Sequence, residues 1–344
     1  MSVLDDFIEG MPKVELHLHI EGSLEPRMMF DLAQRNAVAL PYADVAGIET
    51  AFRRGARFEN LQDFLDLYYA GMSVLWSEAD FHALTLAYLE RAAAQNVVHA
   101  EIFFDPQAHT DRGVPFETVI RGITRAQDEA EQRLGITSHL IMCFLRHLDE
   151  EAAFETLRQS LPYRDRILGV GLDSGEMGNP PAKFQQVFAE ARKQGFRVAV
   201  AHAGEEGPPE YVHEALDLLQ VDRIDHGNRA LEDNALVDRL AESGMALTVC
   251  PLSNYKLCVV DDLKEHPLKI MLDRGLKATM NSDDPSYFDG YVNENYLAVT
   301  EALGLSREDI VTLARNGIEA SFVPPERKAE MRRQLDDYLV AHAV

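Results

Sequence analysis

Two histidines near the start of the chain, His17 and His19, have a type and spacing that suggest metal chemistry. They lie in the stretch KVELHLHIEG, residues 13–22, where apolar residues alternate with polar ones as in a short buried strand. Residues two apart on a strand face the same side, so both imidazoles could hold one metal ion. The same pair could also be buried histidines satisfied by hydrogen bonds, and this stretch alone leaves both interpretations open.

Similar polar residues follow other apolar runs. Eight runs are predicted to be strands: 13–20, 97–105, 139–146, 167–173, 198–205, 223–227, 246–253 and 277–283. His202 and Glu205 lie near the end of the fifth run, His226 near the end of the sixth, and Asp283 and Asp284 at the end of the eighth. Barrel enzymes build their active sites at the carboxyl ends of the strands, so this clustering predicts a metal-dependent catalytic site.

The chemistry of the donor groups indicates which residues bind the metal. His17, His19, His202 and Asp283 offer three imidazoles and one carboxylate, a set that suits a single zinc ion per chain. Zinc that keeps a position for water lowers the pKa of that water to about 7. The sequence therefore predicts hydrolysis at a zinc site.

Three further polar residues are predicted to act beside the metal. His226 could orient the water and take its proton, and Glu205 could present a protonated carboxyl to the substrate as a general acid. Asp284, next to a metal ligand, could bond a ring nitrogen. The alternative for Glu205 and Asp284 is that each caps the following helix.

The elements that must position these residues alternate between strand and helix. Apolar residues at spacings of three and four predict helices at 81–95, 116–134, 184–194, 210–219, 234–243 and 263–274. Such alternation is typical of a parallel sheet, and eight strands in 344 residues predict one (β/α)8 barrel domain, residues 1–344. A doubly wound open sheet is the alternative, although no G-x-G-x-x-G follows any predicted strand.

Two segments break this alternation. Residues 30–79 are too long for one crossover helix and predict a helical insertion, which would form either a lid or pocket wall or extra packing on the barrel side. Residues 293–344 predict two or three terminal helices. We find no internal repeat or linker, and therefore expect no second domain.

The composition excludes several classes of partner. A formal net charge of −24 makes nucleic acids and anionic membrane surfaces poor partners, but it does not disfavour a small neutral ligand. The three cysteines lack C-x-x-C spacing, and no signal region or run of transmembrane length is found. We therefore expect a cytoplasmic protein.

The motifs HLHIEG, AHAGE, DHG and NSDDP, in this order, resemble the adenosine/adenine deaminase branch of the amidohydrolase superfamily. The resemblance implies a mononuclear zinc barrel that hydrolyses the exocyclic amine of a 6-aminopurine. It implies the same four zinc ligands, with Glu205 as the proton donor to N1, His226 beside the zinc-bound hydroxide and Asp284 facing N7. Gly175 lies near the position at which, in the family, a backbone amide contacts N3 of the purine. This chain and the family pattern differ in length at that point.

Glu21 departs from the pattern of the adenosine deaminases, which have an aspartate there that approaches the ribose. The longer side chain would reach into ribose space, and HIEG, SGEMGNPP and HAGEEGPP resemble the adenine deaminases. We therefore expect conversion of adenine to hypoxanthine in purine salvage. Adenosine or an N6-substituted adenine remains an alternative substrate. A binuclear amidohydrolase is disfavoured because that class usually carries a bridging lysine at the end of strand four, and ILGVGLDSGE has none. A purine-binding barrel with an inert metal is disfavoured because such a protein would need neither Glu205 nor His226.

Overall fold

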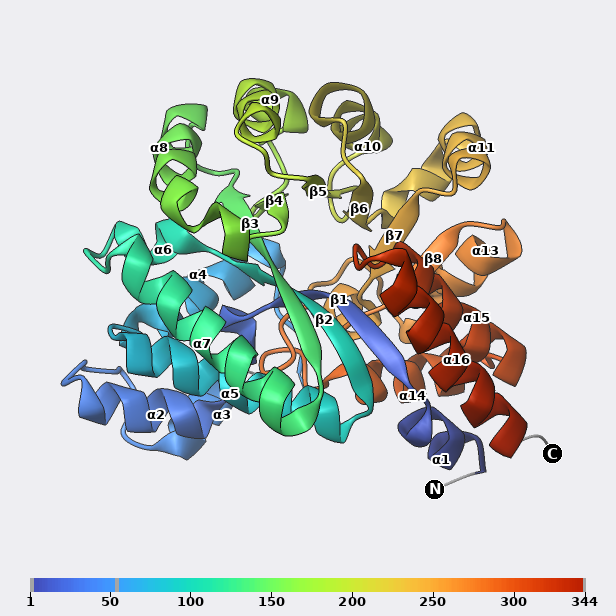
Figure 1. Ribbon diagram of the computed structural model, residues 1–344, viewed down its shortest axis with the longest axis horizontal. Helices are drawn as coiled ribbons and strands as arrows, with labels where there is room; N and C mark the ends of the chain where they lie inside the picture. Colours follow the sequence, from blue (N-terminus) through green and yellow to red (C-terminus); the bar gives the residue numbers. More distant parts are fainter. Residues whose placement is uncertain (1–2, 53–55, 343–344) are drawn as a thin grey trace.

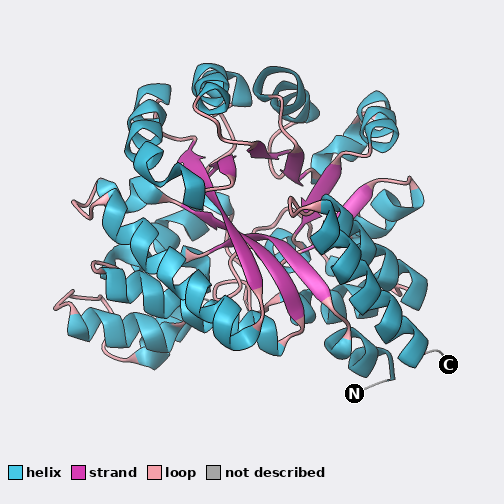
Figure 2. Ribbon diagram, viewed as in Figure 1, coloured by secondary structure: helices cyan, strands magenta, loops and turns pink. Residues whose placement is uncertain are grey.

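Eight parallel strands form a barrel at the centre of the molecule (Figures 1 and 2). The computed structural model describes residues 3–52 and 56–342, and in this part of the chain the strands pair in sequence order. The strands are β1 Lys13–His19, β2 Val97–Phe104, β3 Thr137–Leu145, β4 Gly169–Asp173, β5 Val198–Ala203, β6 Arg223–His226, β7 Ala246–Val249 and β8 Lys277–Met280. The predicted (β/α)8 fold is confirmed.

Asp283, the third residue after the end of β8, closes the barrel against β1. The backbone N–H of Asp283 donates to the carbonyl of His17 at 3.1 Å, and the backbone N–H of His19 donates to the carbonyl of Asp283 at 3.0 Å. A parallel bridge joins Leu18 and Asp283. Three of the residues predicted to bind the metal are therefore fixed by the same backbone seam.

Helices surround the barrel on all sides in Figure 1. The first eight helices are α1 Val3–Gly10, α2 Pro26–Arg35, α3 Val45–Ala51, α4 Leu61–Gly71, α5 Glu78–Ala94, α6 Pro106–Thr110, α7 Phe116–Leu134 and α8 Glu150–Ser160. The others are α9 Gln185–Lys193, α10 Pro209–Glu214, α11 Asn234–Ser243, α12 Pro251–Lys256, α13 Leu268–Asp273, α14 Val292–Leu303, α15 Arg307–Ala320 and α16 Pro325–Ala341. No helix in the described ranges is both long and apolar enough to cross a membrane.

The main differences from the sequence prediction occur at prolines and strand ends. The predicted strand 246–253 stops at Val249, because Pro251 begins α12 in the position where a helix tolerates proline. The predicted helix 263–274 is interrupted, and α13 begins only after Pro267. The helix α8 was not predicted. Strands β5 and β8 are shorter than predicted, so Glu205 and Asp283 lie in the turns that follow them.

The insertion after β1 contains α3 and α4. Helix α4 begins at an Asn60 cap, whose side chain accepts the backbone N–H of Asp63, and its buried face packs over the carboxyl ends of the strands. Of the two alternatives for residues 30–79, the structure supports a pocket wall.

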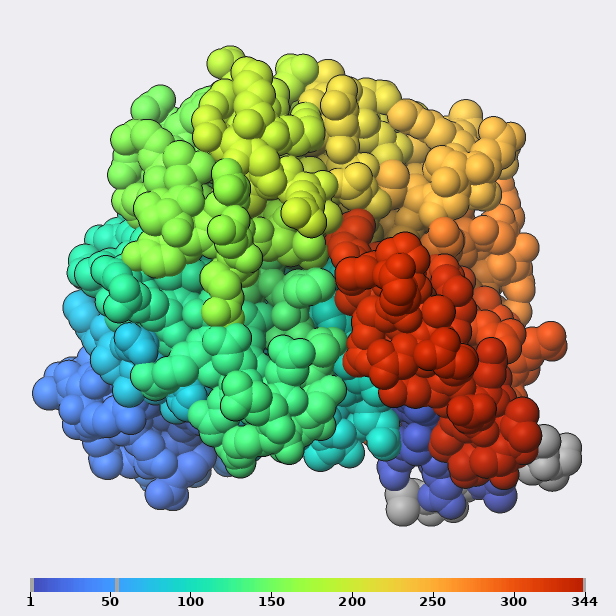
Figure 3. Space-filling model, viewed as in Figure 1, coloured from blue at the N-terminus to red at the C-terminus, as the bar shows by residue number. Residues whose placement is uncertain are grey.

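The predicted terminal helices are α14, α15 and α16. Helix α15 packs against β8 and β1, which completes the helical layer. Helix α16 lies beside α1, where the rings of Phe7 and Tyr338 are 5.4 Å apart. Figure 3 shows the first and last segments together at one side of the molecule, away from the centre of the barrel.

Candidate active site

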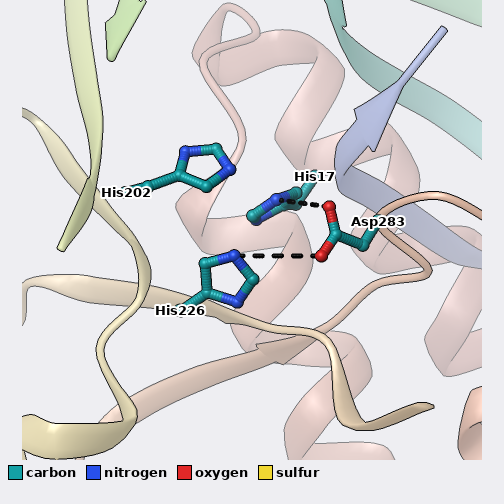
Figure 4. A group of neighbouring side chains, drawn as sticks. All are labelled: His17, His202, His226 and Asp283. Carbon is teal, nitrogen blue, oxygen red and sulfur yellow. Dashed lines mark ion pairs between the residues drawn. The ribbon is translucent and has the colours of Figure 1, made fainter. Parts of the chain in front are cut away.

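Three of the four predicted metal ligands, His17, His202 and Asp283, converge beside His226 inside the carboxyl end of the barrel (Figure 4). His17 Nε2 lies 3.2 Å from Asp283 Oδ1, and His19 Nε2 lies 3.5 Å from the same oxygen and 3.2 Å from His202 Nε2. Donor atoms that surround a metal tetrahedrally at 2.0–2.1 Å are separated by roughly 3.3 Å. The spacing of this set therefore fits one metal ion.

His226 also borders this cluster, and a group of His17, His202, His226 and Asp283 offers donor atoms within 4.8 Å of one another. However, His226 Nε2 is 3.8 Å from Asp283 Oδ2 and 3.6 Å from Glu205 Oε2. These distances place His226 between the metal cluster and Glu205. The role of His226 beside the metal, and not as a further ligand, stays a prediction.

Hydrogen bonds behind His17 orient its ring for metal binding. The Thr248 hydroxyl donates to Asp225 Oδ1 at 2.8 Å, so Thr248 Oγ1 is left to accept the Nδ1–H of His17 at 2.9 Å. This pattern assigns the free lone pair of His17 to Nε2, which has no hydrogen-bond partner among the described residues although it is buried. Such outer partners fix the tautomer of metal-binding histidines.

Burial also gives the donor groups the protonation states that a metal requires. Burial lowers the pKa of His19 to about 3 and that of His202 well below its ordinary value. Burial alone would raise the pKa of Asp283, but the surrounding imidazoles, led by His17, hold it well below the usual range. Neutral imidazoles and an ionised carboxylate are the ligand forms that bind a divalent metal.

Hydrogen bonds behind His226 indicate which of its ring nitrogens carries the proton. The backbone N–H of Leu268 donates to His266 Nδ1, and His266 Nε2–H donates to the Asn254 amide oxygen at 3.0 Å. The Asn254 amide nitrogen then faces His226 Nδ1 at 3.5 Å and donates to it, which leaves the proton on Nε2. In this tautomer His226 points a donor at the metal cluster, and its predicted role beside the metal stays a prediction.

Glu205 lies beside this cluster in a turn built from backbone amides. Burial is the main cause that raises the pKa of Glu205 well above its ordinary value, and the charge of Asp283 adds to it. This shift favours the protonated carboxyl, which is the form in which a general acid must act. Gly204 starts the turn with a φ of +73°, a conformation that favours glycine.

A buried carboxylate, Glu176, holds that turn in place. Its oxygens accept the backbone N–H groups of Gly204 at 2.7 Å, Glu205 at 3.0 Å, Glu206 at 2.9 Å and Gly207 at 2.7 Å. A Cβ atom at Gly207 would come within 2.5 Å of the Glu176 carboxylate, so this residue must be glycine. Glu176 belongs to the motif SGEMGNPP, but the sequence analysis gave it no role.

Asp284 follows the ligand Asp283 and faces the same cavity. Burial, followed by the charge of Asp283, raises the pKa of Asp284 well above its ordinary value. Its Oδ1 atom is buried and accepts no hydrogen bond among the described residues. The side chain lies so close to Gly22 that a Cβ atom there would sit 1.9 Å from that oxygen, which explains the glycine of the first motif. Oδ1 of Asp284 is thus a buried polar atom that could bond a ligand.

The cavity is a small pocket with a volume of about 30 Å³. Helix α4 and the segment after α12 supply an apolar wall, and the strand ends supply a polar wall that includes Ser174, next to Gly175. The apolar wall is formed by Leu61, Phe64, Leu65, Tyr68, Tyr69 and Leu257. A second hollow, at the opposite end of the barrel, is lined by Arg164, Arg166 and Arg197 but by none of the predicted site residues.

The structure corrects the predicted placement of Glu21. Its carboxylate accepts the backbone N–H of Asp105 at 3.1 Å and the Nε2–H of His109 at 2.9 Å. Arg112 donates to the other nitrogen of His109, which fixes that tautomer. Glu21 is therefore turned away from the cavity and does not line it, because these donors hold its charge elsewhere. Asp105 lies in the cavity wall instead.

Several residues of the site were missed by the sequence analysis. Asp105 and Tyr68 line the pocket, Glu176 holds the Glu205 turn, and Thr248 orients His17. Asp105 directly follows β2 at the same end of the barrel as the motifs, so its position gave a signal. Thr248 and Tyr68 gave none, because an isolated hydroxyl in an apolar run has no distinctive pattern.

Three comparisons with known proteins agree with this geometry. The sequence model of the family described as adenosine deaminase matches residues 12–338. An adenine deaminase of Rhodospirillum rubrum is 64% identical over 97% of this chain and 99% of its own length. The crystal structure of adenine deaminase from Arthrobacter aurescens is 48% identical, covers 96% of this chain and 100% of its own, and has a TM-score of 0.93. An amidohydrolase of Burkholderia ambifaria with bound Zn is 30% identical over 99% of this chain and 96% of its own, with a TM-score of 0.87.

Proposed function

The chain belongs to the adenosine deaminase family, and we propose that it is a single-domain zinc enzyme that hydrolyses adenine to hypoxanthine and ammonia. Membership of the family confirms the resemblance seen in the motifs. The observation that carries the proposed chemistry is the convergence of His17, His19, His202 and Asp283 beside the protonated carboxyl of Glu205.

His17, His19, His202 and Asp283 would hold the zinc ion, one per chain. Their donor spacing, their neutral imidazoles and the unpartnered Nε2 of His17 support this assignment. Bound zinc supplies a water with a pKa near 7 and so makes a nucleophile available at neutral pH.

Glu205 would carry out the proton transfers of the reaction, and His226 would orient the attacking water. Glu205 donates its proton to purine N1, which makes C6 more electrophilic, and it regains a proton from the water. The second water proton leaves with the amine as ammonia, and the water oxygen becomes the carbonyl oxygen of hypoxanthine. His226, which presents Nε2–H, orients the water oxygen.

Asp284 would fix the orientation of the purine. Burial favours the protonated form of its carboxyl and Oδ1 has no hydrogen-bond partner among the described residues, so Asp284 would donate a hydrogen bond to N7 while Glu205 donates to N1. The amide of Gly175, next to the pocket residue Ser174, remains the proposed contact to N3. The apolar wall from α4 would cover the ring and exclude water.

Adenine is the proposed substrate because the similar proteins from Rhodospirillum rubrum and Arthrobacter aurescens are adenine deaminases. Adenosine and N6-substituted adenines remain the alternatives, since the same residues would carry out their chemistry. Release of hypoxanthine fits a role in purine salvage. The three cysteines are unpaired in the structure, in keeping with the proposed cytoplasmic location.

The test is a comparison of kcat/KM for adenine, adenosine and N6-methyladenine, followed by ultraviolet absorbance and by release of ammonia or methylamine. We expect adenine to react fastest. Equal or faster reaction of adenosine would overturn the adenine proposal. Reaction of N6-methyladenine alone would keep the zinc chemistry and change the substrate.

A further inference from the structure

Asp105 is a buried carboxylate in the pocket wall that the proposed mechanism does not use. It is 2% exposed and follows β2 directly. The Tyr68 hydroxyl donates to its Oδ2 at 3.3 Å. Its Oδ1 atom accepts no hydrogen bond from any N–H or hydroxyl group of the described residues. A buried carboxylate oxygen without a donor is costly, and such atoms usually await a ligand or water.

The surroundings of Asp105 hold it rigidly. Its backbone N–H is fixed by Glu21, which His109 fixes in turn, and the second carboxyl oxygen is fixed by Tyr68 from α4. The hydrogen bond from the Tyr68 hydroxyl already uses Asp105 as an acceptor. A rigidly held hydrogen-bond acceptor in a pocket wall can distinguish a ligand that carries a matching N–H donor from one that lacks it.

The geometry of a purine places its N9 edge on this wall. With C6 at the metal and N1 at Glu205, Asp284 faces N7. In the purine ring N9 lies next to N7, across C8, and on the side away from N1. Asp105 and Asp284 both line this pocket, and so does Tyr68, which donates to Asp105.

We propose that Asp105 is a specificity-determining residue, whose carboxylate accepts the N9–H of a free purine base. The inference rests on the proposed function and deepens it. In the major tautomer of adenine N9 carries a hydrogen, whereas every nucleoside, nucleotide or 9-alkylpurine has lost it. Such a ligand would leave the carboxylate buried without its donor and would also crowd the wall, so the enzyme would select the free base.

The experiment separates the hydrogen bond from crowding by using an analogue of equal size. We compare kcat/KM for adenine with that for the analogue of adenine in which an oxygen atom replaces N9–H. The ratio of the two values does not depend on the fraction of active enzyme, so a poorly folded variant still gives a valid result. The ratio is measured for the wild type, Asp105→Ala, Asp105→Asn and the control Asp111→Ala, which removes an exposed aspartate six residues along the chain.

We expect the adenine-to-analogue ratio of the wild type to exceed that of Asp105→Ala by about 10- to 100-fold, as for a hydrogen bond to a charged group. Asp105→Asn keeps a carbonyl acceptor and should retain a few-fold of this preference, and Asp111→Ala should match the wild type. If Asp105→Ala has the same adenine-to-analogue ratio as the wild type, the inference is overturned. The proposed function would still stand in that case, provided that the wild type is active on adenine. A wild type without activity on adenine would overturn the proposed function itself, and this inference with it.

Discussion

The carboxylate of Glu176 accepts the backbone N–H of Glu205, the proposed proton donor, at 3.0 Å. The same carboxylate accepts the amides of the three neighbouring residues in that turn. A single side chain from the end of β4 thus determines where the acid stands relative to β5. The arrangement makes Glu176 a positioning residue and leads to the first prediction.

Replacing Glu176 with alanine should lower kcat for adenine by about 100-fold. The reason is that the Glu205 turn would shift, and a displacement of a catalytic group by about 1 Å can lower the rate by that factor. Zinc content and KM should change less, since the metal ligands and the pocket wall remain. Glu176→Gln keeps one acceptor oxygen and should restore part of kcat, and Glu210→Ala, an exposed glutamate on α10, serves as the control. Parallel loss of zinc, with no restoration by glutamine, would indicate a purely structural role.

The variant Glu205→Gln should keep zinc and purine binding but lose about 10²- to 10⁴-fold in turnover. The amide has nearly the same shape, but it cannot donate and regain a proton. Turnover is measured by absorbance and zinc by elemental analysis of the same sample. His202→Ala provides the contrast, because it should lose zinc as well as activity. Near-normal turnover in Glu205→Gln would reduce Glu205 to a helix cap.

The purified protein should contain about one zinc ion per chain, because one four-ligand set is formed at the mouth of the barrel. Dialysis against a chelator should remove the zinc together with the activity, and added zinc should restore both. Two tightly bound metals in each active chain would contradict the mononuclear site.

Thr248→Val should weaken zinc binding by about 10- to 100-fold, because it removes the acceptor that orients His17. The affinity is measured by competition with a chromophoric chelator. A matched control is Thr85→Val, since Thr85 is equally buried but its hydroxyl has no hydrogen-bond partner among the described residues. Equal zinc affinities in the two variants would argue against the role of Thr248.

A prediction independent of the active site concerns Lys13. Burial lowers its pKa to about 7, and its ammonium nitrogen donates to the carbonyl of Gln95 at 2.8 Å. Between pH 7 and about 10 the unfolded chain binds one proton more than the folded chain at this residue, so the free energy of unfolding rises with pH in this window.

Lys13→Met removes this titration. From pH 7 to pH 10 the free energy of unfolding of the wild type should gain up to about 4 kcal/mol relative to the variant, measured by urea unfolding followed by circular dichroism. Lys193→Met, at a lysine whose side chain is 72% exposed, should show no such relative change. Parallel curves for the wild type and Lys13→Met would show that Lys13 keeps an ordinary pKa in the folded protein.

The sequence by itself determined the barrel and the chemical type of the site. Strand and helix periods are local, so the eight runs could be identified without knowledge of their partners. In a parallel barrel all carboxyl ends meet at one mouth, so His17, His202 and Asp283 could be placed together from sequence position alone.

The tertiary structure decided where individual carboxyl groups point and which proton each nitrogen carries. Glu21, expected in the pocket, is turned toward His109, and Asp105 takes its place in the wall. The protonated state of Glu205 and the tautomer of His226 depend on burial and on hydrogen-bond partners far apart in the chain. Such long-range contacts leave no periodic pattern in the sequence, because they arise only when the barrel closes and brings distant side chains within hydrogen-bonding distance.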